Sequence, residues 1–242
     1  MQSSDEGKEW ISLSDTVQHV EFECLFNSRF SCRAFLDTPV SSDVIKSIVE
    51  TATRAPSGGN LQPWKMWVVT GDPLRHFVAD IVAKASENPA GEGSEYHIYP
   101  PKLSEPYKAR RSDIGERMYE ILGIAREDKM GRLAQMMENY TFFGAPCAMF
   151  FAIDKQMQEG QWSDMGMVIQ SIMLLAREHG LHTCPQEIWA MWTPTIKTFL
   201  DIPEDMMFFC GMAIGHADPN APINQLIAPR APMDEVVTYI GN

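Results

Sequence analysis

Arg29, Ser31 and Arg33 are spaced so that they could bind an anionic group together. They lie in the segment 29–35, Arg-Phe-Ser-Cys-Arg-Ala-Phe. Residues four apart share a face in a helix and also in a strand, so the two guanidinium groups converge under either assignment. Ser31 joins them only if the segment is extended. Two arginines and a hydroxyl would form a phosphate cradle, since guanidinium groups give forked, charge-assisted hydrogen bonds. The alternative is a solvated surface pair.

A second segment, residues 55–64, reads Ala-Pro-Ser-Gly-Gly-Asn-Leu-Gln-Pro-Trp and offers backbone N–H groups to a flat or anionic ligand. Prolines near both ends fix the backbone, and the glycine pair removes two Cβ atoms between them. Side chains that both donate and accept hydrogen bonds come from Ser57, Asn60 and Gln62. The alternative is an ordinary helix-to-strand connection made of turn residues.

Composition limits the classes of function. The chain has 242 residues, 45% of them hydrophobic, and a net charge of −12. This charge disfavours nucleic acid and anionic lipid as partners. No run of about 18 apolar residues predicts a membrane span, and residues 1–20 lack the apolar core of a secretory signal. The five cysteines are widely spaced and show neither disulfide nor metal-ligand patterns, so we expect a cytoplasmic protein without a metal site.

Hydrophobic periodicity predicts an alternation of helices and strands. Ser41-Ser42-Asp43 offers a helix N-cap, and Pro73 suits the start of another helix. A long irregular loop over 88–106 is typical of a lid or binding element. The helix over 164–179 is apolar nearly all round, which predicts burial in a core or an interface. The other expected elements are helices over 14–27, 43–54, 107–122 and 126–143 and strands over 64–70, 147–153 and 207–214.

Together the two polar segments resemble the signatures of the FMN-dependent nitroreductase family. The family has an Arg-x-Ser-x-(Arg or Lys)-x-Phe segment, followed about 25 residues later by Pro-Ser-x-x-Asn-x-Gln-Pro-Trp, and this chain has both in that order. The resemblance covers residues 20–240 and is greatest to the nitrobenzoate-reductase-like branch. It implies an α+β fold with a central mixed, mostly antiparallel sheet flanked by helices. We expect an arm over 1–19 and one domain over 20–242, with a lid-like insertion over 88–143.

The resemblance also implies which residues bind FMN. In the first segment these are Arg29, Phe30, Ser31 and Arg33, and in the second Pro56, Ser57, Gly58, Asn60 and Gln62. The family's Pro-x-Glu turn, beside the reactive edge of the flavin, corresponds to Pro185, Gln186 and Glu187. Arg230 matches the arginine of a C-terminal Lys-x-Arg pair. Two positions depart from the family pattern, because Ile188 replaces a frequent glycine and Ala228 stands where the lysine would be.

The implied activity is reduction of nitroaromatic or similar electron-poor acceptors by NADH or NADPH, in two-electron, ping-pong hydride transfers through tightly bound FMN. No catalytic side chain is required, because the cofactor does the chemistry. Two alternatives remain. The same fold could perform reductive dehalogenation, enone reduction or flavin reduction, which turnover with different acceptors would separate. The protein could also store or sense FMN without turnover, which steady-state oxidation of NAD(P)H would exclude.

The insertion carries the candidate substrate residues Tyr107, Arg110 and Arg111. An aromatic ring and guanidinium groups suit a small aromatic acid, and the alternative is a solvated basic helix end. The resemblance implies an intertwined homodimer with FMN at the interface, and the apolar helix 164–179 is physically consistent with it. The apolar run 236–240 could add a strand to the partner's sheet.

Overall fold

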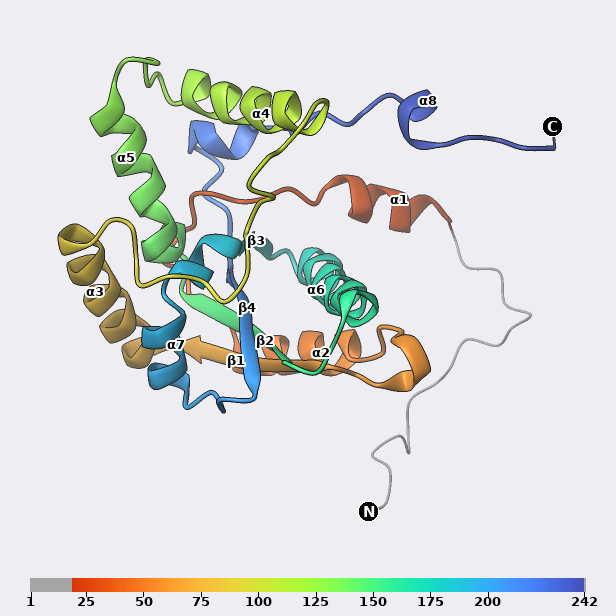
Figure 1. The fold of residues 1–242 in the computed structure, drawn as a ribbon, viewed down its shortest axis with the longest axis horizontal. Coiled ribbons are helices and arrows are strands. Elements are labelled where there is room, and N and C mark those ends of the chain that lie inside the picture. The colour runs from red at the N-terminus through yellow and green to blue at the C-terminus, as the bar shows by residue number, and fades with distance from the viewer. Residues whose placement is uncertain (1–18, 242) are drawn as a thin grey trace.

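A computed structural model describes residues 19–241. Within them, four strands form one antiparallel sheet in the spatial order β1-β2-β4-β3, with helices on both faces (Figure 1). The strands are β1 (Trp64–Thr70), β2 (Cys147–Asp154), β3 (His182–Gln186) and β4 (Met206–Gly215). A parallel contact is added by the isolated bridge between Ser31 and Thr183. The expected α+β class and flanked, mostly antiparallel sheet are confirmed.

Along the described residues the expected helices occur in the predicted order, and two further helices, over 193–200 and 233–236, were not expected. The α-helices are α1 (His19–Asn27), α2 (Ser42–Ala52), α3 (Gly71–Glu87), α4 (Tyr107–Ile121), α5 (Lys129–Met137), α6 (Glu159–Glu178), α7 (Thr193–Leu200) and α8 (Met233–Val236). Short 3₁₀ turns are η1 (Gly58–Asn60), η2 (Glu138–Gly144), η3 (Glu187–Met191) and η4 (Pro222–Gln225). The description begins at His19. Residues 1–18, which hold nearly all of the expected arm over 1–19 and the start of the helix expected over 14–27, therefore lie outside the described residues.

The two central strands are buried on both faces. Alternate residues of β2 point to opposite sides, so Phe150 joins one core and Phe151 the other. The first core lies under α3, α7 and η2, and the second lies under α2 and α6. Because both faces of β2 and β4 are covered, their sequences are continuous apolar runs rather than alternating ones.

Local sequence chemistry explains most element boundaries. Ser41 caps α2, since its hydroxyl accepts a hydrogen bond from the Asp43 N–H. The helix expected over 126–143 ends at Met137, where the 3₁₀ turn η2 begins. Within η2, Phe142 and Phe143 have left-handed φ angles of 52° and 56°, which an α-helix cannot contain. Both rings are buried in the core, and this burial offsets the cost of the unusual backbone. That boundary prediction was wrong.

Helix α6 is longer than expected and presents one face outward. It begins at Glu159, behind a capping box formed by Gln158 and Gln161. Seven of its residues are buried against the sheet, whereas Met167 remains 36% exposed. Among the described residues, no helix combines the length and apolarity that crossing a membrane requires.

The close approach of Gly211 to Trp189 provides a test of the core. A Cβ atom at Gly211 would lie 2.5 Å from Trp189 Cδ1, and the fully buried Trp189 ring is stacked on Phe142 at 4.3 Å between centroids. We expect Gly211→Ala to lower the free energy of unfolding by about 1–3 kcal/mol, because the core cannot take up the added methyl group. Urea denaturation measures this. Gly160→Ala is the control, since a Cβ there meets no atom within 4 Å; an equal effect in both variants would contradict the explanation.

Candidate functional site

The first polar segment is extended and lies beside β3. The Cys32 N–H donates to the Thr183 carbonyl at 3.0 Å, and Cys32 is completely buried. The segment is therefore extended, which is the alternative under which Ser31 would share a face with Arg29 and Arg33. The Phe30 ring turns inward and packs on His182 at 5.2 Å between centroids.

Asn224, which the sequence did not suggest, fixes this segment. Its side-chain oxygen accepts from the Arg33 N–H at 2.9 Å. Its amide group donates to the carbonyls of Ala34 at 2.8 Å and Asp218 at 2.9 Å. One side chain thus satisfies backbone groups from both ends of the chain.

Three predicted cations gather here. Burial and the nearby Arg230 guanidinium lower the pKa of Arg29. Arg33 and Arg29 both act on the buried Cys184, although burial dominates and raises the pKa of that thiol to about 11. Among the described residues, no carboxylate forms an ion pair with Arg29, Arg33 or Arg230. Such a group of like charges is suited to an anionic ligand.

The expected turn over 180–187 is a strand instead. Gly180 ends the preceding helix with a φ of 71°, as predicted, but His182–Gln186 then pairs with β4 along its whole length. Pro185 is tolerated because β3 lies at the edge of the sheet, where a missing N–H breaks no ladder. The strand carries Gln186 and Glu187 to the rim of the sheet.

A cavity of about 590 Å³ opens at this rim. Its wall contains four of the predicted positions, Arg33, Pro185, Gln186 and Glu187, together with Ile188. The insertion adds Tyr99 and Asn139, and α6 adds Gly166 and Ile169. Neither Tyr99 nor Asn139 was predicted, since an aromatic ring in a loop and an amide in an expected helix give no specific signal.

Some polar groups in this wall have hydrogen-bond partners within the chain and others do not. The Gln186 amide group donates to the Asn139 carbonyl at 2.9 Å, and within the described residues the buried Gln186 Oε1 has no partner. Burial raises the pKa of Glu187, so its carboxyl keeps a proton to higher pH than a solvated glutamate does. The cavity therefore offers an acceptor without a partner, Gln186 Oε1, and a carboxyl group of raised pKa, Glu187, in a wall that also contains Arg33.

The second polar segment does not line this cavity within one chain. Pro56, Asn60 and Gln62 are exposed, and the Gly58 N–H donates to the buried Asp164 carboxylate at 3.2 Å. The Ser57 hydroxyl accepts from the Gln62 N–H at 3.0 Å. Asn60 and Gln62 hold left-handed backbone angles of 57° and 48°, a strained shape that is concentrated at functional loops.

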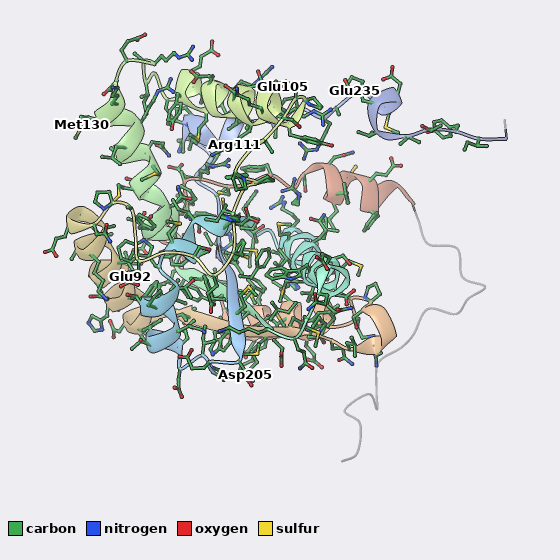
Figure 2. All side chains as sticks on the ribbon, viewed as in Figure 1. Glu92, Glu105, Arg111, Met130, Asp205 and Glu235 are labelled. Carbon is green, nitrogen blue, oxygen red and sulfur yellow. The ribbon has the colours of Figure 1, made fainter. Side chains whose placement is uncertain are left out.

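The candidate substrate residues separate into two groups. Arg111 stacks over the Tyr99 ring, with its Cζ atom 4.0 Å from the centroid, and lies on the side of α4 that faces the body of the molecule (Figure 2). Arg110 instead forms an ion pair with Glu235 at 2.6 Å. Tyr107 is 59% exposed, with Arg110 5.9 Å above its ring. Of these three candidate residues, Arg111 is the one that contacts a residue of the cavity wall, namely Tyr99.

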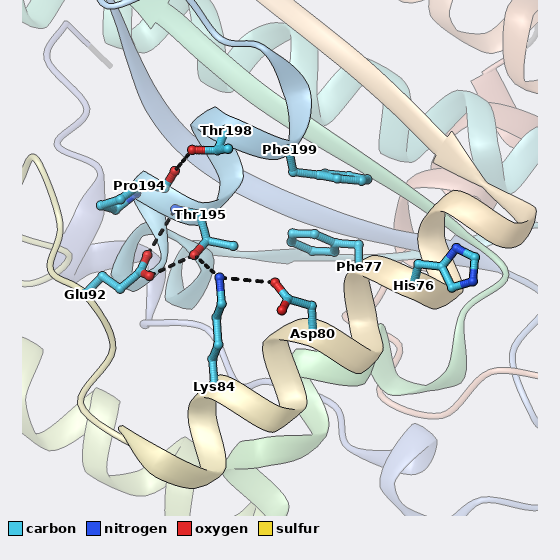
Figure 3. Close-up of a pocket in the computed structure, with 9 residues that line it drawn as sticks. All are labelled: His76, Phe77, Asp80, Lys84, Glu92, Pro194, Thr195, Thr198 and Phe199. Atoms are coloured by element: carbon cyan, nitrogen blue, oxygen red, sulfur yellow. Dashed lines mark hydrogen bonds and ion pairs between the residues drawn. The ribbon is translucent and has the colours of Figure 1, made fainter.

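Another hollow, of about 530 Å³, lies between α3 and α7 and contains none of the predicted residues (Figure 3). Lys84 pairs with Asp80 at 3.2 Å and donates to the Thr195 hydroxyl at 3.0 Å. The Glu92 carboxylate accepts from the Thr195 hydroxyl at 2.8 Å and from its N–H at 3.0 Å. These polar groups satisfy one another, so the network fastens the start of the 88–143 insertion to α3 and α7.

Comparison with known proteins agrees with the motifs. Residues 27–216 match the model of the nitroreductase family. The chain is 36% identical to a 4-nitrobenzoate reductase of Pseudomonas putida, covering 91% of this chain and 96% of that protein. It is 34% identical to a nitrobenzene nitroreductase of Ectopseudomonas oleovorans, covering 89% and 95%. The crystal structure of the FMN- and NADPH-dependent nitroreductase NfnB from Sphigopyxis sp. strain HMH superimposes with a TM-score of 0.88 at 46% identity, covering 91% and 99%. The cation cluster, the edge strand and these matches over most of the chain lead to one conclusion: this protein belongs to the nitroreductase family.

Proposed function

We propose that the protein is an FMN-dependent oxidoreductase that uses NADH or NADPH to reduce nitroaromatic compounds. The observation that carries this proposal is the group Arg29, Arg33 and Arg230, which has no carboxylate counter-charge among the described residues and stands beside the cavity at the end of β3. The names of the similar proteins, two nitroaromatic reductases and an FMN- and NADPH-dependent nitroreductase, support it.

The residues present fit FMN. The arginine group matches a phosphate dianion, and Ser31 on the same side of the extended segment adds a hydroxyl. The unpartnered Gln186 Oε1 can accept a hydrogen bond from a polar ring N–H. The chemistry that bound FMN would supply is two-electron hydride transfer between NAD(P)H and the nitro compound, in ping-pong order.

The chain's own groups bind, orient and shield. Arg29, Arg33 and Arg230 would hold the phosphate, which fixes one end of the cofactor. The backbone of Pro185, Gln186 and Glu187 lies along the cavity wall, and Ile188 makes that wall bulkier than a glycine would. Tyr99, which is 49% exposed, contributes an aromatic ring to the cavity wall. Ala228 contributes no charge, but its carbonyl accepts from Arg230 at 2.8 Å and so orients that guanidinium.

We also propose that the protein works as a homodimer, in which the second polar segment of the partner subunit completes the site. Within one chain this segment is exposed and held by Asp164, on the same helix as the cavity residues Gly166 and Ile169. Apolar side chains remain uncovered on α1, α6 and the tail, with exposures of 56% for Phe22, 36% for Met167 and 94% for Ile240. Exposed apolar surface of this kind is typical of a subunit interface.

The first test addresses the phosphate clamp. Arg29→Gln and Arg33→Gln should each raise the Kd for FMN on the order of 10- to 150-fold, because each loses a charge-assisted contact worth about 1.5–3 kcal/mol. Titration of the apoprotein with FMN and with riboflavin measures this, and the parent should bind FMN far more tightly than riboflavin. Arg75→Gln on α3 is the control, since Arg75 pairs with Asp72 on the surface. Unchanged FMN affinity in both clamp variants would refute the assignment.

The second test addresses the acceptor, which we propose to be an aromatic acid such as a nitrobenzoate. Arg111→Gln should lower kcat/KM for 4-nitrobenzoate roughly two- to fivefold and leave nitrobenzene nearly unaffected, because one partly exposed charge contributes about 0.5–1 kcal/mol. Added salt should lower the parent's kcat/KM for the acid only. Arg110→Gln is a matched control, since Glu235 already neutralises Arg110. Equal losses for both acceptors in Arg111→Gln would count against the role of Arg111.

The third test addresses assembly. Light scattering at micromolar concentration should give twice the mass of one chain, and Met167→Glu should shift the protein toward the monomer, because it places a charge on the uncovered face of α6. Met130→Glu is the control, since Met130 is 73% exposed at the start of α5 (Figure 2). A folded parent with the mass of a single chain would exclude the dimer.

A further inference from the structure

A second hollow on the insertion carries an excess of positive charge. It has a volume of about 640 Å³ and is lined by Lys102, Lys108 and Arg111, with Pro100 and Pro101 at one side. Its volume is within the range of small-molecule sites. In a chain of net charge −12, such a concentration of cations needs a reason.

The charges of this hollow are not balanced from within. The carboxylate in its wall, Glu116, is held by Arg132 through two hydrogen bonds of 3.0 and 2.9 Å. Within the described part of the chain, neither lysine nor Arg111 forms an ion pair with a carboxylate. Other lysines of the protein do have carboxylate partners, namely Lys46, Lys84, Lys155 and Lys197. The hollow therefore keeps three uncompensated cations for a ligand.

The hollow adjoins the cavity at the end of β3. Tyr99 lines the cavity, and the next residue, Pro100, lines the hollow. The Arg111 guanidinium, which lines the hollow, is stacked over the ring of Tyr99, which lines the cavity. A ligand that spans both spaces would have an uncharged, reactive part and a distant part with several negative charges. A nitrobenzoate has a single carboxylate, whereas a dinucleotide donor with an additional phosphate has the larger charge far from its nicotinamide ring.

We propose that the hollow at Lys102 and Lys108 binds the adenosine end of NADPH through its 2′-phosphate, so that the enzyme prefers NADPH to NADH. This inference rests on the proposed function, because it assumes that the neighbouring cavity receives the nicotinamide. The two lysines supply the charge for the phosphate, and Arg111 stands between the hollow and the Tyr99 wall. Adenine has a flat face that can lie against the rigid Pro100-Pro101 pair.

Calorimetry on the FMN-loaded protein tests the site without turnover. The probes are adenosine 2′,5′-bisphosphate, 5′-AMP and inorganic phosphate. The parent should bind the bisphosphate at least tenfold more tightly than 5′-AMP. The double variant Lys102→Gln/Lys108→Gln should lose tenfold or more of the affinity for the bisphosphate and no more than threefold for 5′-AMP. Its kcat/KM for 4-nitrobenzoate, measured at saturating donor, should stay within twofold of the parent.

A matched control removes two positive charges elsewhere. Lys65 on β1 and Lys129 on α5 form no ion pair among the described residues and do not line the hollow. Lys65→Gln/Lys129→Gln should therefore bind the bisphosphate like the parent. Equal weakening in both double variants would mean that net charge alone is responsible, and would overturn the proposal.

Other outcomes also overturn it. Equal affinity for inorganic phosphate and the bisphosphate would mark an unspecific anion patch, and a loss confined to 4-nitrobenzoate turnover would assign the hollow to the acceptor. Failure of the proposed function is distinguishable, because bisphosphate binding needs no turnover. Reduction of nitroaromatics at equal rates with NADH and NADPH, with no effect of the lysine pair, would sink this inference alone.

Discussion

Burial of the central strands on both faces determines where polar chemistry can lie in this protein. Strands β2 and β4 are almost entirely enclosed between the two cores, so a charged or hydrogen-bonding group on them would be costly. The candidate functional side chains lie instead at the edge strand β3, in the extended segment beside it and on the insertion. The candidate site is polar and lies at the rim of an apolar sheet.

Electrostatics adds a second constraint. The chain is strongly acidic, yet its described cations fall into two kinds. Four lysines and four arginines of the described residues form ion pairs with carboxylates, and such pairs contribute little to stability when they are exposed. Arg29, Arg33 and Arg230 at one place, and Lys102, Lys108 and Arg111 at another, are left without carboxylate partners. Keeping like charges together costs folding free energy, and bound anions would restore it by mass action.

Much of the fold was predictable because local signals agreed with the tertiary structure. The strand Trp64–Thr70 and the Ser41 cap follow from residue types alone. The end of α5 at Met137 did not, since it depends on Phe142 and Phe143 being drawn into the core in a backbone shape that sequence patterns disfavour. Strand β3 was missed because Pro185 argues against a strand unless the edge position is known.

The part of the candidate site that lies within sequence motifs was predictable. Arg33, Gln186 and Glu187 were expected and lie in one wall, whereas Asn139, Tyr99 and Asn224 enter through long-range contacts that no local pattern encodes. Arg110 and Arg111 are equivalent in sequence, and only the position of Glu235 distinguishes them. The second polar segment was recognised, but within one chain it does not line the cavity.

The fastening of the first segment by Asn224 has a consequence for biosynthesis. Arg33 and Asn224 are 191 residues apart, and the Asn224 side chain joins the backbone at Arg33 and Ala34 to that at Asp218, beside a direct hydrogen bond of 3.0 Å from the Asp218 N–H to the Ala34 carbonyl. At typical rates of translation, roughly 10 to 40 s pass between the synthesis of the two residues. During that interval the arginines of the nascent chain have no fixed arrangement. The arrangement of this segment is therefore one of the last features that the ribosome's product acquires, and a chain truncated before η4 would carry the motif without Asn224, which holds it.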